Sequence, residues 1–185
     1  SLGDKEFDED DVEVYKGDCD VLSGGPEGAS PRPPPAPPRT VPTTGSAGRI
    51  DADPDQVPAP VGAYPHARRV GDLLYLSGVG PRQPRTDAIP GGPIRDSSGQ
   101  PLDYDVAAQT RAVIENVKRV LEASGSSLDK VLDVTVFLVD MDRDFAEYNR
   151  VYAETFASVG ATRTTVAIRA LPTPIAVEFK VIAKA

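Results

Sequence analysis

The chain changes character near residue 60, and this change limits the fold more than any other feature. Residues 1–60 carry 13 of the 28 acidic residues but 5 of the 20 basic ones, which accounts for the whole net charge of −8. The same stretch holds 11 of the 19 prolines. Such a segment buries too little apolar surface to offset the entropy of ordering it. We therefore predict an acidic, proline-rich tail or linker over residues 1–60 and one folded domain over residues 61–185.

The role of the tail stays open at the level of sequence. Its first part is acidic with a few apolar side chains, and its second part is rich in Pro, Gly, Ser and Thr. The run from Pro33 to Pro38 favours polyproline II. A solubility element, a segment that docks on the domain or on a partner, and a segment added by gene fusion all fit this composition.

Composition also narrows the chemistry. One Cys and one His, His66, cannot build an internal disulfide or a structural zinc site. The acidic run from Asp140 to Asp144 is more typical of a polar helix start than of a metal site. Gly78-Val79-Gly80 lacks the third glycine of a phosphate-binding loop. We therefore expect neither a metal nor a cofactor.

The charge and hydropathy patterns exclude other partners. The acidic tail next to a neutral domain offers no basic stripe for nucleic acid. No apolar run reaches the roughly 18 residues of a membrane span. The N-terminus is acidic and lacks the basic and apolar blocks of a signal peptide. We expect a cytoplasmic protein that binds neither nucleic acid nor membrane.

From residue 61 onward the pattern becomes regular. Residues 66–70 and 73–77 flank Gly71-Asp72 and predict a β-hairpin. Residues 79–103 are rich in Pro and Gly and predict a long loop of the kind that is often functional. Residues 104–124 repeat apolar side chains at helical spacing, with Gly125 as a natural stop.

The second half of the domain adds three strands and one helix. Residues 131–139, 162–170 and 175–183 are rich in β-branched side chains and predict strands. Residues 142–157 place Phe145, Tyr152 and Phe156 on one helical face. The order β-β-α-β-α-β-β indicates an α+β fold with one mixed sheet and two helices packed on one face. A sheet with one bare face favours oligomerisation.

Several polar residues interrupt these apolar elements. Glu178 and Lys180 point to the same face of their strand, away from Phe179. Spacing alone favours a solvated face for this pair, whereas a cleft would let burial and a nearby Arg163 set the charge of Glu178. A lone His66 near the start of a strand is more often structural than catalytic.

Eight short stretches of the domain then match one known pattern, in order and at matching spacing. They are Gly62–Pro65, Leu76–Gly78, Gln109 with Glu115–Val117, Val134–Met141, the spaced aromatics from Asp144 to Phe156, Arg163–Val166, Leu171-Pro172 and Val177-Glu178. Together they strongly resemble the RidA (YjgF-type) family of enamine/imine deaminases, over residues 61–185. The tail lies outside the resemblance.

The resemblance implies a chorismate-mutase-like fold that assembles as a homotrimer, with active sites in clefts between subunits. It implies that Arg163 binds the substrate carboxylate and that Glu178 holds the hydrolytic water, so that both side chains reach one crevice. The remaining implied substrate contacts are Tyr64, Ser77, Gly78, Asn149 and Thr165. No cofactor is implied, because the carbon of an imine is already electrophilic.

The chain also departs from the generic family pattern. Thr165 stands where many relatives have Cys, Lys180 replaces the second acid of Glu-x-Glu, and the 79–103 loop is longer. The segments 62–69 and 80–84 are more similar to the 2-aminomuconate deaminase branch. That branch implies conversion of 2-aminomuconate to 2-hydroxymuconate (4-oxalocrotonate) and ammonia.

A dicarboxylate substrate requires a second cation. Arg82 is the first candidate, with Arg85 beside it and Arg68, Arg69 and Arg95 behind. Two other functions stay open. One is a broad 2-iminobutanoate/2-iminopropanoate deaminase that clears reactive intermediates, and the other is a non-enzymatic trimeric ligand-binding module.

Overall fold

The structure is a computed structural model that describes residues 48–185. Residues 1–47, which make up most of the expected tail, lie outside the described residues. The elements in chain order are β1 (Arg49–Ile50), β2 (Ala67–Val70), β3 (Leu73–Leu76), α1 (Val106–Ala123), the short 3₁₀ helix η1 (Leu128–Lys130), β4 (Val131–Leu138), α2 (Met141–Phe156), β5 (Thr162–Ala167) and β6 (Val177–Lys184).

The ordered domain begins before residue 61. β1 pairs antiparallel with β2, and Arg49 lies opposite Arg68. Ala52 and Val57 are only 6% and 3% exposed and belong to the core. Residues 48–60 therefore form part of the domain, although their charge and proline content resemble those of the tail. Strand pairing and two small buried apolar side chains join this segment to the domain, and composition averaged over 60 residues conceals them.

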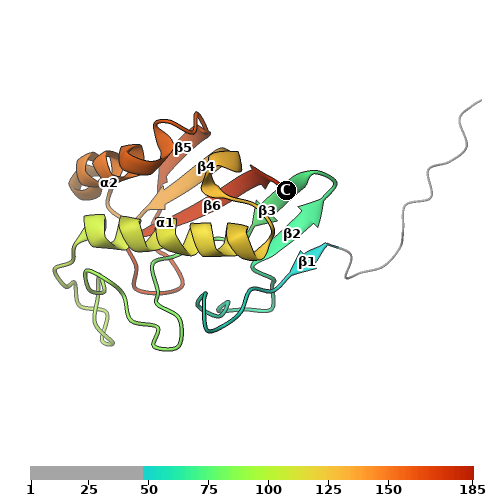
Figure 1. Ribbon diagram of the computed structural model, residues 1–185. Helices are drawn as coiled ribbons and strands as arrows, with labels where there is room; N and C mark the ends of the chain where they lie inside the picture. The colour runs from blue at the N-terminus through green and yellow to red at the C-terminus, as the bar shows by residue number, and fades with distance from the viewer. Residues whose placement is uncertain (1–47) are drawn as a thin grey trace, which may run out of the picture. The chain divides into compact units, whose positions relative to one another are not determined.

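One mixed sheet and two helices make up the domain. The strand order is β1-β2-β3-β6-β4-β5, and only β4 and β5 run parallel. Both helices lie on the same face of the sheet, side by side (Figure 1). This confirms the expected α+β architecture, including the hairpin at Gly71, whose φ of 59° suits glycine.

Each helix begins at an aspartate that caps it. Asp105 accepts a hydrogen bond from the backbone N–H of Ala108 at the start of α1. Asp140 does the same for the N–H of Arg143 at the start of α2. The acidic run at 140–144 is therefore a helix start, as expected. Within residues 48–185 no three His, Cys, Asp or Glu side chains come together as a metal site would require.

Alternation along β6 separates the two faces of the sheet. Val177, Phe179 and Val181 are fully buried beneath the helices. Glu178 and Lys180 therefore point to the opposite face, which no helix of the described part covers (Figure 1). Apolar side chains also lie on this bare face, since Phe137 of β4 stands opposite Glu178.

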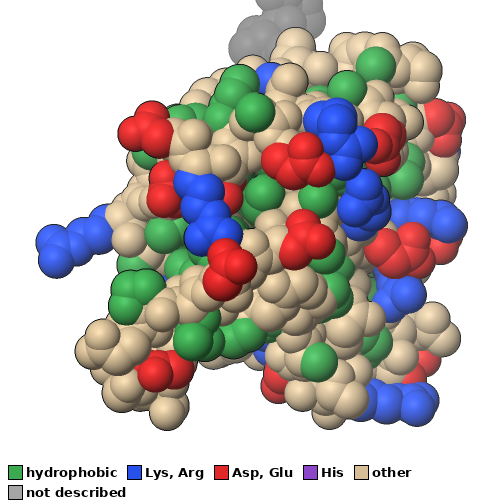
Figure 2. Space-filling view, turned by 90° about the vertical axis from the view of Figure 1, so that its left-hand side faces the viewer, with side chains coloured by type: hydrophobic (Ala, Val, Ile, Leu, Met, Phe, Trp, Pro, Cys, Tyr) green, Lys and Arg blue, Asp and Glu red, His purple; other side chains and the backbone are tan. Residues whose placement is uncertain are grey.

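Charges on the surface are mixed. Figure 2 shows one side of the domain, on which acidic and basic side chains are interspersed among hydrophobic ones. No basic stripe crosses this side. No helix between residues 48 and 185 has both the length and the apolar character that crossing a bilayer requires.

Candidate active site

A cavity of about 370 Å³ opens on the bare face of the sheet. This volume is within the range of small-molecule sites. We call it the Glu178 cavity. Its lining comes from the first half of β6 and from three loops, one of which begins directly after β3, and consists of Val61, Tyr64, Ser77, Gly78, Gly80, Arg82, Pro172, Thr173, Ile175, Glu178 and Lys180. Four sequence candidates, namely Tyr64, Ser77, Gly78 and Arg82, thus lie around Glu178.

Gly78 makes room for the carboxyl group of Glu178. A Cβ atom at position 78 would lie 2.3 Å from Oε1 and 2.8 Å from the carboxyl carbon of Glu178. Any side chain here would displace the carboxyl group, so the glycine is needed for close approach. Next to it, the Ser77 hydroxyl donates a hydrogen bond of 2.6 Å to the Pro65 carbonyl, which holds the chain beside Tyr64 in place.

Burial sets the charge state of the two ionisable groups on β6. Burial raises the pKa of the Glu178 carboxyl above its usual range. Burial lowers the pKa of the Lys180 ammonium, which donates a hydrogen bond to the Leu76 carbonyl. A carboxylate that is partly desolvated and has no cation paired to it is a suitable general base.

Buried amides on α1 hold the loops that line the cavity. The Asn116 side chain donates 2.9 Å hydrogen bonds to the carbonyls of Gly80 and Arg82. The Gln109 side chain donates to the Gly92 carbonyl and accepts a 2.8 Å bond from the N–H of Ala176, just before β6. Both amides are fully buried, so the long loop and the start of β6 are fixed to the helix.

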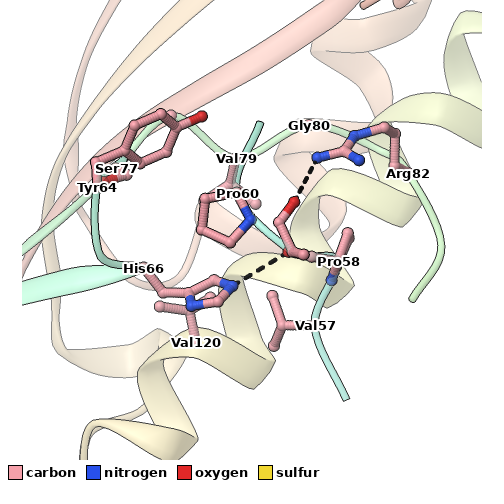
Figure 3. A pocket seen from close by; sticks show the side chains of 12 residues that line it. Val57, Pro58, Pro60, Tyr64, His66, Ser77, Val79, Gly80, Arg82 and Val120 are labelled. Atoms are coloured by element: carbon pink, nitrogen blue, oxygen red, sulfur yellow. Dashed lines mark hydrogen bonds between the residues drawn. The ribbon is translucent and has the colours of Figure 1, made fainter. Parts of the chain in front are cut away.

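Residues 57–60 form an outer wall next to the Glu178 cavity, around a small side pocket of about 50 Å³ (Figure 3). His66 Nε2 lies 3.1 Å from the Pro58 carbonyl, and His66 Nδ1 accepts a hydrogen bond from the N–H of Ala52. Because Nδ1 is the acceptor, Nε2 carries the proton. His66 therefore has a structural role, as its sequence context suggested.

Arg82 also holds the outer wall of residues 57–60 in place. Its guanidinium donates to the Ala59 carbonyl at 2.8 Å (Figure 3) and forms an ion pair of 2.5 Å with Asp87. Of the five loop and strand arginines proposed from sequence, Arg82 alone lines the Glu178 cavity. Arg85 instead pairs with Asp55 at 2.8 Å on the surface.

Arg163 lies in a second, open depression of about 410 Å³ between β5 and α2. We call it the Arg163 groove; its lining is Asn149, Tyr152, Ala153, Phe156, Ala157, Gly160, Ala161 and Arg163. The guanidinium donates a 2.8 Å hydrogen bond to Asn149 Oδ1 and stacks 4.6 Å above the Tyr152 ring. No carboxylate in residues 48–185 pairs with it, so its remaining N–H donors are available to a carboxylate ligand.

Thr165 follows on the same face of β5. Its hydroxyl shares a 2.7 Å hydrogen bond with the Tyr148 hydroxyl, and it lines neither depression. In one chain this threonine fixes α2 against the sheet. The arrangement explains how Arg163 is oriented, because both Asn149 and Tyr152 come from α2.

Arg163 and Glu178 do not meet within one chain. Arg163 stands opposite Val134, a fully buried residue of the helix-covered face. Glu178 stands opposite Phe137 on β4. Phe137 and Val134 are separated by an odd number of residues along β4, so their side chains point to opposite faces, and Glu178 lies on the face opposite to that of Arg163. The two side chains therefore do not reach one crevice within a single subunit. The crevice between subunits that we expected stays a prediction, and it requires Arg163 of one subunit to face Glu178 of another.

Sequence reasoning did not find three parts of the site. It left the 57–60 wall in the tail and gave no role to the Leu171–Pro174 turn. It placed Lys180 on the face of Glu178 and noted it as a departure from the family pattern, but gave it no part in the site. The sequence did contain a signal for Gln109 and Asn116, whose amides hold the loops of the site. They lie seven residues apart on the apolar face of the predicted helix, which indicates that both amides are buried.

Comparison with known proteins decides the family. Residues 54–185 match the family model described as "Endoribonuclease L-PSP". The chain belongs to this family, to which the RidA and YjgF proteins also belong. A RutC family protein of Pyrococcus horikoshii is 40% identical over 129 residues, which cover 70% of this chain and 92% of the relative. The 2-iminobutanoate/2-iminopropanoate deaminase of Escherichia coli is 32% identical over 132 residues, 70% of this chain and 92% of that enzyme.

Solved structures of family members share the fold. RidA from the Antarctic bacterium Psychrobacter sp. matches with a TM-score of 0.62 and 32% identity, over 74% of this chain and 100% of RidA. E. coli TdcF, solved with bound serine, matches with a TM-score of 0.61 and 31% identity, over 74% of this chain and 98% of TdcF.

Proposed function

We propose that this protein is a hydrolytic deaminase of 2-imino acids and their 2-amino-enoate tautomers, with active sites between the subunits of a homotrimer. The observation that carries the proposal is the Glu178 carboxyl group, whose pKa burial raises and which lines a cavity of small-molecule size. The relationship to a 2-iminobutanoate/2-iminopropanoate deaminase supports the same chemistry.

The two faces of the sheet supply complementary groups. In the proposed assembly, Arg163 of one subunit binds the substrate carboxylate with its two-donor fork. Asn149 and Tyr152 orient that guanidinium. Glu178 of the next subunit holds a water molecule against C2 of the imine. The proposal therefore assigns the two halves of the site to two chains.

The reaction proceeds in balanced steps. Glu178 removes a proton from water while the oxygen forms a bond to C2, and the imine nitrogen takes up a proton from solvent to become an amine. The C2–N bond of this carbinolamine then breaks, the nitrogen leaves as ammonia with the proton from Glu178, and the hydroxyl on C2 returns a proton to solvent as it becomes a carbonyl. Each imino acid and one water thus yield one 2-oxo acid and one ammonia. No redox change occurs, so no electron carrier is required.

Within this class we propose 2-aminomuconate as the substrate, with 2-hydroxymuconate (4-oxalocrotonate) and ammonia as products. The argument is the charge around the Glu178 cavity, where Lys180 forms none of the ion pairs of residues 48–185 and the guanidinium of Arg82 lies in the same lining. A substrate with a carboxylate at each end would interact with both Arg163 and this cavity. Tyr64, Ser77, Gly78 and Thr165 are proposed to shape the site around it.

The test is ammonia release from freshly prepared 2-aminomuconate and from 2-iminobutanoate. We expect the wild type to release ammonia from both, faster from 2-aminomuconate, and Arg163→Ala to lose at least about a hundredfold in kcat/KM, the order of two lost charge-assisted hydrogen bonds. Equal rates on both substrates would favour the broad deaminase. Activity on neither would favour the ligand-binding module and contradict the proposal.

Cleavage of RNA, which the family description names, has less support from this chain. The single histidine has both ring nitrogens engaged with backbone groups. The side of the domain in Figure 2 interleaves acidic with basic residues and offers no continuous track for phosphates.

A further inference from the structure

Lys180 brings a positive charge to the Glu178 cavity. It lies two residues after Glu178 on β6, and strand alternation directs both side chains to the same face. At a rise of about 3.3 Å per residue, their Cα atoms are roughly 6.6 Å apart along the strand. Opposite charges at that spacing are close enough to attract one another.

In this structure the two groups do not pair. The Lys180 ammonium forms none of the ion pairs within residues 48–185, and its hydrogen bond goes to the Leu76 carbonyl. Burial alone moves the pKa of each group toward its neutral form. An ammonium has three donors, so two remain for a ligand. A partly buried cation with free donors is therefore exposed to the cavity.

Arg82 differs from Lys180 in this respect. Its charge is already compensated by Asp87 at 2.5 Å, and a second donor is bound to the Ala59 carbonyl. Binding an anion to Arg82 would compete with an existing ion pair, whereas binding to Lys180 would supply a missing partner. An anionic ligand therefore gains more by binding to the Lys180 ammonium than by binding to Arg82.

We propose that Lys180 is the specificity-determining residue that binds the second carboxylate of a dicarboxylic imino acid. This inference rests on the proposed function for the orientation of the substrate, with C2 at Glu178 and the first carboxylate at Arg163 of the neighbouring subunit. It assigns to Lys180 the discrimination that the sequence assigned first to Arg82, and it leaves Arg82 the task of holding the 57–60 wall.

The experiment measures binding of two 2-oxo acids that share a five-carbon chain, 2-oxoglutarate and 2-oxopentanoate, by titration calorimetry on the full-length protein. We expect the wild type to bind 2-oxoglutarate more tightly. Lys180→Met should lower the affinity for 2-oxoglutarate by about ten- to a hundredfold, the range of a hydrogen bond to a charged group, and leave 2-oxopentanoate unchanged. Lys180→Arg should retain most of the preference.

Lys184→Met is the matched control, because it removes the same charge from the same strand outside the cavity. It should behave as the wild type. The inference is wrong if the wild type does not prefer the dicarboxylate, if Lys180→Met weakens both ligands equally or neither, or if the preference is lost in Arg82→Met but kept in Lys180→Met.

Turnover of the matching imino acids separates this inference from the proposed function. Both are made in the assay from glutamate and norvaline by an amino-acid oxidase. If neither is hydrolysed but the binding preference follows Lys180, the deaminase proposal fails and the role of Lys180 stands. If both are hydrolysed at a ratio that Lys180→Met does not alter, the deaminase proposal stands and the role of Lys180 is contradicted.

Discussion

The carboxyl group of Glu178 lies against the backbone at Gly78, and each residue constrains the other. The nearest obstacle to a Cβ at position 78 is the far end of a flexible side chain, the Glu178 carboxyl. Such a clash is relieved by rotating the glutamate, at small cost to folding. A side chain at position 78 would therefore change the position of the candidate base, the Glu178 carboxyl group, more than the stability of the fold.

Gly78→Ala is therefore expected to fold with nearly unchanged thermal stability and to lose about a hundredfold in kcat, because a displacement of the order of 1 Å has that effect on positioned catalytic groups. Steady-state kinetics and thermal melts on the same preparation check this. A large fall in melting temperature together with full activity of the folded fraction would show that Gly78 serves the fold and not the site.

The raised pKa of Glu178 predicts how activity depends on pH. A general base must be ionised, so log kcat/KM should decrease as the pH drops, with the slope expected for uptake of one proton. The midpoint of this decrease should lie above 4.5, the usual pKa of a glutamate carboxyl. A pH profile of imino acid hydrolysis measures this midpoint. A midpoint at or below 4.5, or an acidic limb that persists in Glu178→Gln, would exclude Glu178 as the base.

The same group affects stability with a definite sign. Between pH 4.5 and the raised pKa, the folded chain binds more protons than the unfolded one, so the free energy of unfolding decreases as the pH rises. Glu178→Gln should raise the melting temperature at pH 7, because it removes a charged group that burial destabilises. This gain should shrink as the pH falls toward 4.5. Melting curves at several pH values check the sign.

At the scale of elements, the site depends on how loops are fixed to the helices and the sheet. Asn116 on α1 binds two loop carbonyls, and His66 before β2 binds two backbone groups of residues 52–58. The outer wall is therefore held by side-chain hydrogen bonds, although it has almost no regular secondary structure.

His66→Ala removes the hydrogen bonds of the imidazole to the Pro58 carbonyl and to the Ala52 N–H, and leaves this N–H without its partner. We expect a loss of about 1–3 kcal/mol in the free energy of unfolding, because a buried donor is left unsatisfied. Chemical denaturation measures this loss. The midpoint of the pH–activity profile should stay where it is in the wild type. A shifted midpoint would assign His66 a part in proton transfer.

The elements themselves were predictable because their signals are local. A few adjacent residues determine each of three features: the Gly71 hairpin, the helix cap at Asp105 and the β-branched run of β4. The 57–60 wall was not predictable, because its order comes from contacts with His66 and Arg82, which are distant in the chain. The resemblance identified Arg163 and Glu178, but not that they lie on opposite faces; that fact comes from the register of β4 with β5 and β6.

At the scale of the whole molecule, the bare face of the sheet is the dominant feature. It carries Phe137 and Tyr75 beside Glu178 and Lys180, and no described helix covers it. Apolar side chains in such a position favour association with another copy. In the proposed trimer this face lies against a neighbouring subunit, and an Arg163 groove lies near each Glu178 cavity.

Subunit complementation tests this account most directly. Arg163→Ala and Glu178→Gln, each carrying a different affinity tag, are expressed separately and together, and ammonia release is measured on the purified mixed oligomers. Each variant alone should be inactive. Every trimer that contains both variants has one site in three that combines an intact Arg163 with an intact Glu178, so about a third of wild-type activity should return. Mixed oligomers that remain as inactive as the single variants would contradict a site shared between subunits.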